Sequence, residues 1–479
     1  MSERYDAVVV GSGPNGLAAG IRLLQAGRSV LILEANAEPG GGARSAALTL
    51  PGFVHDVCSS VHPLGVASPY FQKLPLARYG LVWRHTRFAM AHPGEGQDAA
   101  VLSQDLDDTV ASLGEDGARY RRHMAPLVAA WPSIKGDVLG PLGFPRRPVA
   151  MGRFGMVALR SAAGVARSWF RGEAARRFWA GLAAHGGPPL TWRGTSAAAL
   201  VLGLCGHAEG WPVPEGGAGR LIAALLGHYR ELGGQLRTQA VVRRLSDLPA
   251  HRVALLSVTP RQLAEMADPE LPRRTRRALA RRRFGPSVCK VDWALSGPIP
   301  WQAQACRETM TVHLGRSLDQ ILRSEARPFV TPGGPLAAPY VLLTQPTVGD
   351  PSRAPAGQHT AWAYCHVPWE SDEDATEVIE AEIEQHAPGF SDLILARHTR
   401  TAPALAAYNP TYVGGDIAGG TASLWQMVVR PALTLDPYGT PLPHVFLCSS
   451  STPPGPAVHG LCGLGAAERA LAYLASQGA

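Results

Sequence analysis

Short apolar runs alternate with helically spaced apolar residues at the start of the chain. Residues 5–10 (YDAVVV) are rich in β-branched side chains, which predicts a buried strand of a parallel sheet. Residues 17–27 carry apolar side chains at helical spacing and end on glycine, which is typical of a helix and its C-terminal cap. Residues 29–33 predict a second strand. The order strand, helix, strand indicates a βαβ unit and an α/β fold.

The same patterns predict elements further along the chain. We expect helices at residues 105–113, 118–130, 220–232 and 464–474. We expect strands at residues 81–85, 235–238, 240–245, 252–258, 287–295 and 445–448. Strands therefore recur in widely separated parts of the chain.

The turn between the first strand and the first helix is rich in glycine and reads Gly11-Ser12-Gly13-Pro14-Asn15-Gly16. Gly11 permits a tight turn, Gly13 lets a pyrophosphate approach the backbone, and Gly16 lets the helix pack closely on the strand. The start of the helix offers unpaired N–H groups and a positive dipole end to phosphates. These features together predict a dinucleotide-binding site.

Glu34 stands at the end of the second predicted strand. A carboxylate at this place can accept hydrogen bonds from both ribose hydroxyls of a dinucleotide. It would repel a 2′-phosphate, so the position disfavours NADP.

A second glycine pair follows this acid, at Gly40 and Gly41, and Arg44 comes soon after. The pattern resembles the double-glycine motif of the FAD-linked amine oxidase and carotenoid desaturase superfamily. The resemblance implies that the pair extends the phosphate cradle and that the arginine neutralises the phosphates. In many relatives the arginine follows the pair directly, whereas here Gly42 takes that place, so a surface position for Arg44 is an equal alternative.

The C-terminal segment carries a further motif. A predicted strand is followed by Thr452-Pro453-Pro454-Gly455, by Val458-His459-Gly460 and then by the last predicted helix. This resembles the flavin motif of phytoene desaturase-like oxidoreductases, as do residues 53–63 and 409–420. The resemblance implies that Val458, His459 and Gly460 lie at the flavin and that the backbone of Val242, or of its neighbour Val241, meets the adenine. A helix N-terminus aimed at reduced flavin would stabilise its negative charge.

The resemblance also implies the architecture. We expect a Rossmann-like FAD-binding domain built from the discontinuous segments 1–90, 206–284 and 400–479. Segments 91–205 and 285–399 would form an interleaved α+β substrate domain.

The function implied is that of an FAD-dependent oxidoreductase. It would transfer a hydride from a C–H bond of a hydrophobic, polyene or lipid-like substrate to flavin N5, as a desaturase or oxidase. One alternative is a flavin amine oxidase that forms an imine. An alternative of another class is a non-catalytic lipid carrier resembling the GDP-dissociation inhibitors.

Three side chains are candidates for a direct catalytic part. His62 and His459 lie in the motifs that resemble flavin-contacting segments, although a hydrogen-bonded structural role is the favoured interpretation of each. Lys290 lies on a predicted strand and resembles the lysine that can hold a water near flavin N5 in amine oxidases. No metal-ligand or GxSxG motif occurs, so we expect no metal and no serine nucleophile.

The amino-acid composition limits the class of protein and the cellular compartment that we expect. Apolar residues make up 46% of the 479 residues, which excludes a disordered chain. The seven cysteines are scattered and odd in number, which suits a reducing compartment. No signal peptide or long apolar run is visible, so we expect a cytoplasmic protein.

The net charge of +7 comes from an arginine-rich composition. Arginines gather in residues 141–184 and 273–283, and solvated helix faces are the favoured interpretation of both. Peripheral contact with an anionic membrane is the alternative. Nucleic-acid binding is not expected, since no aromatic residues interleave with the second cluster.

Overall fold

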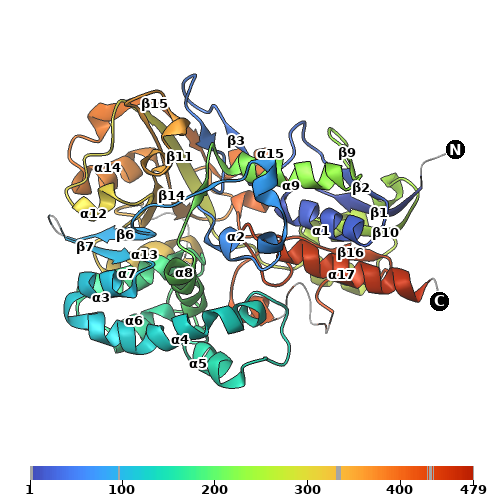
Figure 1. The fold of residues 1–479 in the computed structure, drawn as a ribbon, viewed down its shortest axis with the longest axis horizontal. Coiled ribbons are helices and arrows are strands. Elements are labelled where there is room, and N and C mark those ends of the chain that lie inside the picture. Colours follow the sequence, from blue (N-terminus) through green and yellow to red (C-terminus); the bar gives the residue numbers. More distant parts are fainter. Residues whose placement is uncertain are drawn as a thin grey trace.

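The described part of the protein contains two large β-sheets that lie side by side with helices around them (Figure 1), and two further sheets of two strands each. The computed structural model describes residues 4–94, 96, 98–330, 336–428, 430, 434 and 436–477. Strands of the first sheet come from residues 5–33, 235–256 and 445–447, and those of the second from residues 90–102, 287–314 and 341–400. The order of both sheets therefore differs from the order of the chain.

The first sheet is parallel throughout. Its strands run in the order β16 (Val445–Leu447), β10 (His251–Leu256), β1 (Tyr5–Val10), β2 (Val30–Leu33) and β9 (Gln235–Arg237). The apolar runs of β1, β2 and β10 are buried because helices cover both faces of a parallel sheet.

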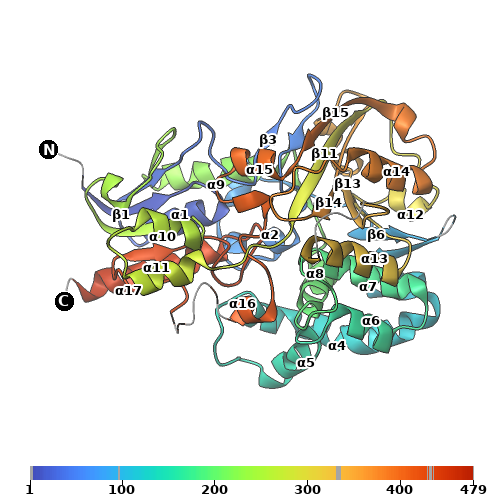
Figure 2. The same cartoon turned by 180° about the vertical axis from the view of Figure 1, so that it is seen from behind.

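Alternate residues of β10 show how the two faces are covered. Val253 and Leu255 belong to the core that contains α1 (Pro14–Gln25), α9 (Ala218–Glu231) and α17 (Leu461–Ser476). Ala254 and Leu256 belong to a core with α10 (Pro260–Met266) and α11 (Arg273–Ala280). Helices α1 and α17 therefore cover the face seen in Figure 1, and α10 and α11 the face seen in Figure 2.

The second sheet is mixed. Its strands run in the order β15 (Ile394–Arg400), β11 (Ser287–Leu295), β14 (His359–Val367), β13 (Val341–Thr344), β12 (Thr311–Leu314), β6 (Met90–Pro93) and β7 (Ala99–Leu102). All neighbouring pairs are antiparallel except β12 and β6. Helices α12 (Gln304–Arg307) and α14 (Thr376–His386) pack on one face of this sheet.

A layer of helices lies beside the second sheet, at the bottom of Figure 1. Its members are α3 (Leu106–Ser112), α4 (Gly117–Val138), α5 (Pro148–Ala158), α6 (Ala162–Trp169), α7 (Glu173–Ala184), α8 (Ser196–Ala208) and α13 (Leu318–Ala326). The remaining short elements are α2 (Pro63–Ala67), α15 (Ala402–Tyr408), α16 (Leu424–Val428) and the two-residue strands β3 (Ser45–Ala46), β4 (His55–Asp56), β5 (Trp83–Arg84) and β8 (Val213–Pro214).

Most predicted elements are present with small changes of boundary, and two predictions fail. Residues 240–245 form no strand, because the backbone N–H groups of Arg243 and Arg244 both donate to the Asp247 carboxylate and fold the segment into a turn. The strand expected at 81–85 is limited to Trp83–Arg84, which pairs with Val213–Pro214.

Candidate active site

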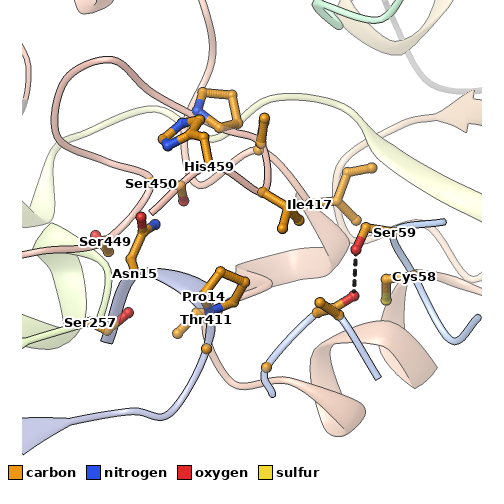
Figure 3. A pocket seen from close by; sticks show the side chains of 18 of the residues that line it. Pro14, Asn15, Cys58, Ser59, Ser257, Thr411, Ile417, Ser449, Ser450 and His459 are labelled. Atoms are coloured by element: carbon orange, nitrogen blue, oxygen red, sulfur yellow. Dashed lines mark hydrogen bonds between the residues drawn. The ribbon is translucent and has the colours of Figure 1, made fainter. Parts of the chain in front are cut away.

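The two ends of the chain meet at one large cavity. The cavity has a volume of about 1160 Å³ and is lined both by the glycine turn of residues 11–15 and by residues 453–459 before α17. Figure 3 shows Pro14 and Asn15 from the first segment close to Ser449, Ser450 and His459 from the second. The glycine turn and the C-terminal loop, far apart in the sequence, therefore meet in space.

The glycine turn is shaped by close backbone contacts on one side and open space on the other. A Cβ atom on Gly16 would lie 1.9 Å from the Gly11 carbonyl oxygen, so only glycine fits between the helix and the strand. A Cβ atom on Gly13 would meet only the Cα of Gly41, at 3.8 Å. Helix α1 begins at Pro14, beside the cavity, where its first N–H groups have no partner within the helix. The turn thus leaves room for a phosphate group at a positive helix end.

Ser12 and Glu34 connect the parts of this cradle. Glu34 Oε2 accepts hydrogen bonds from the Ser12 backbone N–H (2.9 Å) and hydroxyl (2.5 Å), and its Oε1 accepts from the backbone N–H (2.9 Å) and the side-chain amide (3.1 Å) of Asn36. The Ser12 hydroxyl also accepts from the Gly40 N–H. Glu34 lines the cavity, and each of its oxygens already accepts two protein hydrogen bonds. A bound ribose would therefore share this carboxylate with Asn36 or Ser12.

The residues of the second glycine motif differ in whether they line the cavity. Gly41 lines the cavity, whereas Gly40 packs behind it against Ile222. The Arg44 guanidinium lies 4.2 Å from the centre of the Tyr408 ring, and its Nε donates to the Gly41 carbonyl and the Tyr408 hydroxyl. Arg44 is not one of the described residues that line the cavity. Its observed contacts position the backbone of the glycine pair.

The C-terminal loop packs on the glycine turn. A Cβ atom on Gly463 would lie 1.8 Å from the Asn15 carbonyl oxygen, so the starts of α17 and α1 are in backbone contact. Gly460 has a positive φ of 71° and abuts Phe71 and Ala18, just behind the lining residues Val458 and His459. Two helix N-termini therefore converge on the same cavity.

His459 is buried and holds this loop in shape. Its Nε2 donates to the Gly455 carbonyl (3.1 Å), and its Nδ1 accepts from the Leu461 N–H (3.0 Å). Burial lowers the pKa of His459 to about 4, so the ring is neutral with its proton on Nε2. Both ring nitrogens are used within the loop, which identifies His459 as a structural histidine at the cavity wall.

His62 also lines the cavity, next to α2. Its side chain is buried, and burial lowers its pKa to about 4. Its Nε2 lies 3.4 Å from the Ser59 hydroxyl, which in turn donates to the Gly42 carbonyl, as drawn in Figure 3. A neutral His62 can therefore accept or donate a hydrogen bond but carries no charge at neutral pH.

Lys290 lies on β11 at the wall formed by the second sheet. Its Nζ donates to the Asp56 carbonyl (3.1 Å), forms an ion pair with Asp292 and lies 4.9 Å from the centre of a Trp362 ring. Asp56 is itself paired with the buried Arg353. Lys290 is thus a rigidly held cation facing the cavity, and a catalytic part for it stays a prediction.

Two aromatic residues of this wall were missed in the sequence analysis. Trp362 and Tyr364 lie on β14, both line the cavity, and their rings are nearly parallel, with planes 9° apart and centres 6.1 Å apart. Alternate residues Ala361, Ala363 and Cys365 pack against α14 on the other face. The alternation along residues 359–367 is the signal that could have identified them.

Arg430 is a second residue that the sequence did not single out. Its side chain is buried and lines the cavity, and Nη1 donates to the Ser450 carbonyl (2.8 Å). Its Nε is buried without a hydrogen-bond partner among the described residues. Burial lowers the pKa of Arg430. A buried cation with an incomplete set of partners suits an anionic ligand.

Val242 lines the cavity with Val241 and Arg243, next to Glu34. The N–H of Ala240 donates to the Glu34 carbonyl (2.8 Å), which holds this segment against the end of β2. In the described part of the chain, no three His, Cys, Asp or Glu side chains gather as a metal site requires.

Comparisons with known proteins agree with this geometry. A family model described as an NAD(P)-binding Rossmann-like domain matches residues 9–74. The chain is 24% identical to the pyridine nucleotide-disulfide oxidoreductase domain-containing protein 2 of Rattus norvegicus, over 98% of this chain and 93% of that protein. It is 26% identical to a phytoene dehydrogenase of Streptomyces griseus, over 75% of this chain and 72% of that protein.

Solved structures share the whole architecture. A putrescine oxidase has a TM-score of 0.62 at 16% identity, and the cyclohexylamine oxidase of Brevibacterium oxydans IH-35A has 0.62 at 14%, both over the full length of each chain. A Rab GDI from Plasmodium falciparum has a TM-score of 0.55 at 11% identity, over 99% of this chain and 98% of that one. Together these comparisons confirm the resemblance that the two glycine motifs and the C-terminal motif indicate.

Proposed function

Because the chain has the fold of the FAD-dependent oxidoreductases, we propose that it oxidises a C–H bond of a hydrophobic, polyene or lipid-like substrate. When bound, FAD would supply the redox chemistry by accepting a hydride at its flavin. The single observation that carries the proposal is the cavity shared by the glycine turn and the C-terminal loop. Everything else that the reaction needs from the protein is binding, orientation and exclusion of water.

The residues present suit FAD. The open face of Gly13 and the start of α1 suit the pyrophosphate, and Glu34 suits a ribose. The unpaired Nε of the buried Arg430 suits a negative charge. Residues 453–459 and the start of α17 suit the flavin, because a helix N-terminus stabilises negative charge on a reduced ring.

The rest of the cavity suits an apolar substrate. It continues past the C-terminal loop into a chamber between the second sheet and the helical layer, with lining residues Val138, Leu139, Phe154, Val201, Leu202, Trp211 and Leu342. Apolar walls bind a hydrophobic molecule by removing its surface from water and keep water from the reacting centre. Polyene or lipid-like molecules have the chemistry that such walls recognise.

A second candidate function is amine oxidation. Trp362 and Tyr364 stand side by side in the cavity wall, where two parallel rings can hold an amine between or against them. The nearby cation Lys290 opposes it, since a protonated amine would be repelled at this short range.

Anaerobic bleaching of the flavin tests both candidates. The purified holoprotein is mixed without oxygen with polyenes, lipids and amines in turn, and the visible flavin bands are followed. We expect bleaching by polyenes or lipids and none by amines. Bleaching by amines alone supports the second candidate, and a folded protein without flavin bands supports a lipid carrier instead.

A further inference from the structure

Large apolar side chains stand in solvent on one short segment of the helical layer. Five of the exposed large hydrophobic residues described lie between residues 142 and 159, and Phe144 and Leu142 are 93% and 78% exposed. We refer to the five as the apolar rim: Leu142, Phe144, Val149, Met156 and Leu159. Single exposed apolar residues are common on protein surfaces, but a cluster of this kind marks a contact site.

The fold itself produces this rim. Helix α5 buries Phe154 and Ala158 on its inner face. Its outer face presents Val149, Arg153 and Met156 at helical spacing. The loop from α4 to α5 adds Leu142 and Phe144 beside them. The helix therefore has a second apolar face that no part of the described chain covers.

Helix α16 extends the same surface. Figure 2 shows α16 next to the loop that joins α4 to α5. Trp425 on this helix is 68% exposed. Tryptophan is enriched at membrane interfaces, where its ring sits at the level of the lipid headgroups.

The charge around the rim is mostly positive, although Asp137 pairs with Arg146 and Asp319 pairs with Arg167. Residues 138–172 contain six arginines and no aspartate or glutamate. Arg147 and Arg153 are exposed, and neither forms an ion pair within the described residues. An apolar surface flanked by unpaired arginines is complementary to anionic lipid headgroups above an acyl layer. It is a poor contact for a second copy of the chain, because two such surfaces would repel each other.

One residue of the rim, Leu142, lies at an opening of the cavity. Leu142 lines the cavity and is also largely exposed, so it stands where the chamber meets solvent. Residues 138–141 and Phe154 continue the lining inward from there. The apolar rim thus adjoins an entrance to the apolar chamber at Leu142.

We propose that the apolar rim docks on the surface of an anionic lipid bilayer, with its arginines at the headgroups. The rim enters only the interface, and among the described residues no helix is long and apolar enough to cross a membrane. A substrate dissolved in the bilayer then enters the chamber beside Leu142 without crossing water. This last step rests on the proposed function, whereas docking itself does not.

Vesicle co-sedimentation of the holoprotein tests the docking. Vesicles of phosphatidylcholine with and without phosphatidylglycerol are compared at low and high salt. We expect binding to the anionic vesicles that weakens with salt. The double variant Phe144→Asp/Met156→Asp should lose at least tenfold in bound fraction, and Arg147→Gln/Arg153→Gln should lose about fivefold per arginine on anionic vesicles.

Matched controls come from other surfaces. Leu395→Asp changes an exposed leucine of β15, and Arg274→Gln/Arg277→Gln removes two exposed arginines of α11, where no large hydrophobic residue described is exposed. Both controls should bind as the wild type does. Failure of the wild type to bind, or equal losses in rim and control variants, overturns the proposal.

Two further outcomes are informative. If Phe144→Asp/Met156→Asp converts a dimer to a monomer in light scattering, the rim is an interface between copies and the bilayer proposal is wrong. The flavin spectrum is recorded for every variant. A wild type that keeps its flavin spectrum but does not bind the vesicles contradicts docking alone, and a wild type that binds the vesicles but has no flavin spectrum contradicts the proposed function alone.

Discussion

At the scale of single residues, the side chains around the glycine turn differ in how many of their hydrogen bonds are already made within the protein. Glu34 already accepts four protein hydrogen bonds, Arg44 is held by Tyr408, and Arg430 has a buried Nε without a partner. Motif spacing identified Glu34 and Arg44 but not Arg430, because a lone arginine outside a motif has no distinctive pattern. Its importance becomes visible only when burial and the neighbouring Ser450 carbonyl are known.

Glu34→Ala should weaken FAD binding by about 1–3 kcal/mol, the range for hydrogen bonds to a charged group. The variant loses both the proposed ribose contact and the bonds to Ser12 and Asn36. Equilibrium dialysis measures the change. Glu38→Ala, an exposed acid of the next loop, serves as the control and should bind FAD normally. An unchanged dissociation constant in Glu34→Ala would remove Glu34 from the cofactor site.

Two arginine variants separate the candidate partners of the phosphates. Arg430→Gln should raise the dissociation constant of FAD about tenfold or more, because charge-assisted hydrogen bonds contribute about 1.5–3 kcal/mol. Arg44→Gln should have a smaller effect, since its guanidinium already serves Gly41 and Tyr408. The same dialysis measures both. The reverse order of effects would show that Arg44 swings into the site when FAD binds.

At the scale of elements, the strands and helices that the sequence locates best are those whose faces are buried. Strands β1, β2 and β10 are apolar along their whole length because both faces are covered, and the sequence locates them well. Helix α4 was expected to end at residue 130, yet it continues to Val138 past Pro132. The buried Trp131 and Ile134 hold that turn in place, a tertiary contact that local propensity cannot reveal.

Packing of α17 on α1 should respond sharply to one methyl group. Gly463→Ala would place a Cβ atom against the Asn15 carbonyl and should lower the free energy of unfolding by about 1–3 kcal/mol or more. Gly136→Ala, in α4, meets nothing within 4 Å and should be neutral or stabilising by up to ~1 kcal/mol. Denaturant titration of both variants makes the comparison. Equal stability of the two would mean that the helix starts do not touch.

At the scale of the whole molecule, the cavity is lined by segments that lie far apart in the sequence. The glycine turn and the C-terminal loop are predictable one by one, but the chamber is not. Trp362 and Tyr364 of β14, Trp211 and the end of α4 reach it only through the order of the second sheet and its helical layer. A single sequence carries no signal that shows which distant strands and helices pack together. The βαβ unit and its glycines, in contrast, are recognisable from neighbouring residues alone.

Buried histidines should make the whole fold acid-sensitive. Burial lowers the pKa of five of them to about 3 or 4, namely His55, His62, His92, His207 and His459. In the unfolded chain these rings bind protons from about pH 6.5 downward. The unfolded state therefore binds more protons, and stability falls as the pH drops from 6.5 toward 4.

Each such histidine contributes at most about 1.4 kcal/mol per pH unit within that window. His366 opposes the trend, since the Glu325 carboxylate raises its pKa although burial lowers it. Denaturant titration at pH 7.0 and pH 5.0 measures the net effect. His207→Gln should show a shallower slope than the wild type, and stability that is equal at the two pH values would contradict the neutral, buried state of these rings.

The ratio of FAD to protein in the purified chain tests the central claim most directly, when measured for the wild type and for Gly13→Val. We predict one FAD per wild-type chain. We predict almost none in the variant, because the valine side chain occupies the open space at the glycine turn that the pyrophosphate needs. A folded wild-type protein without flavin, or a Gly13→Val variant that keeps its full complement, would contradict the account.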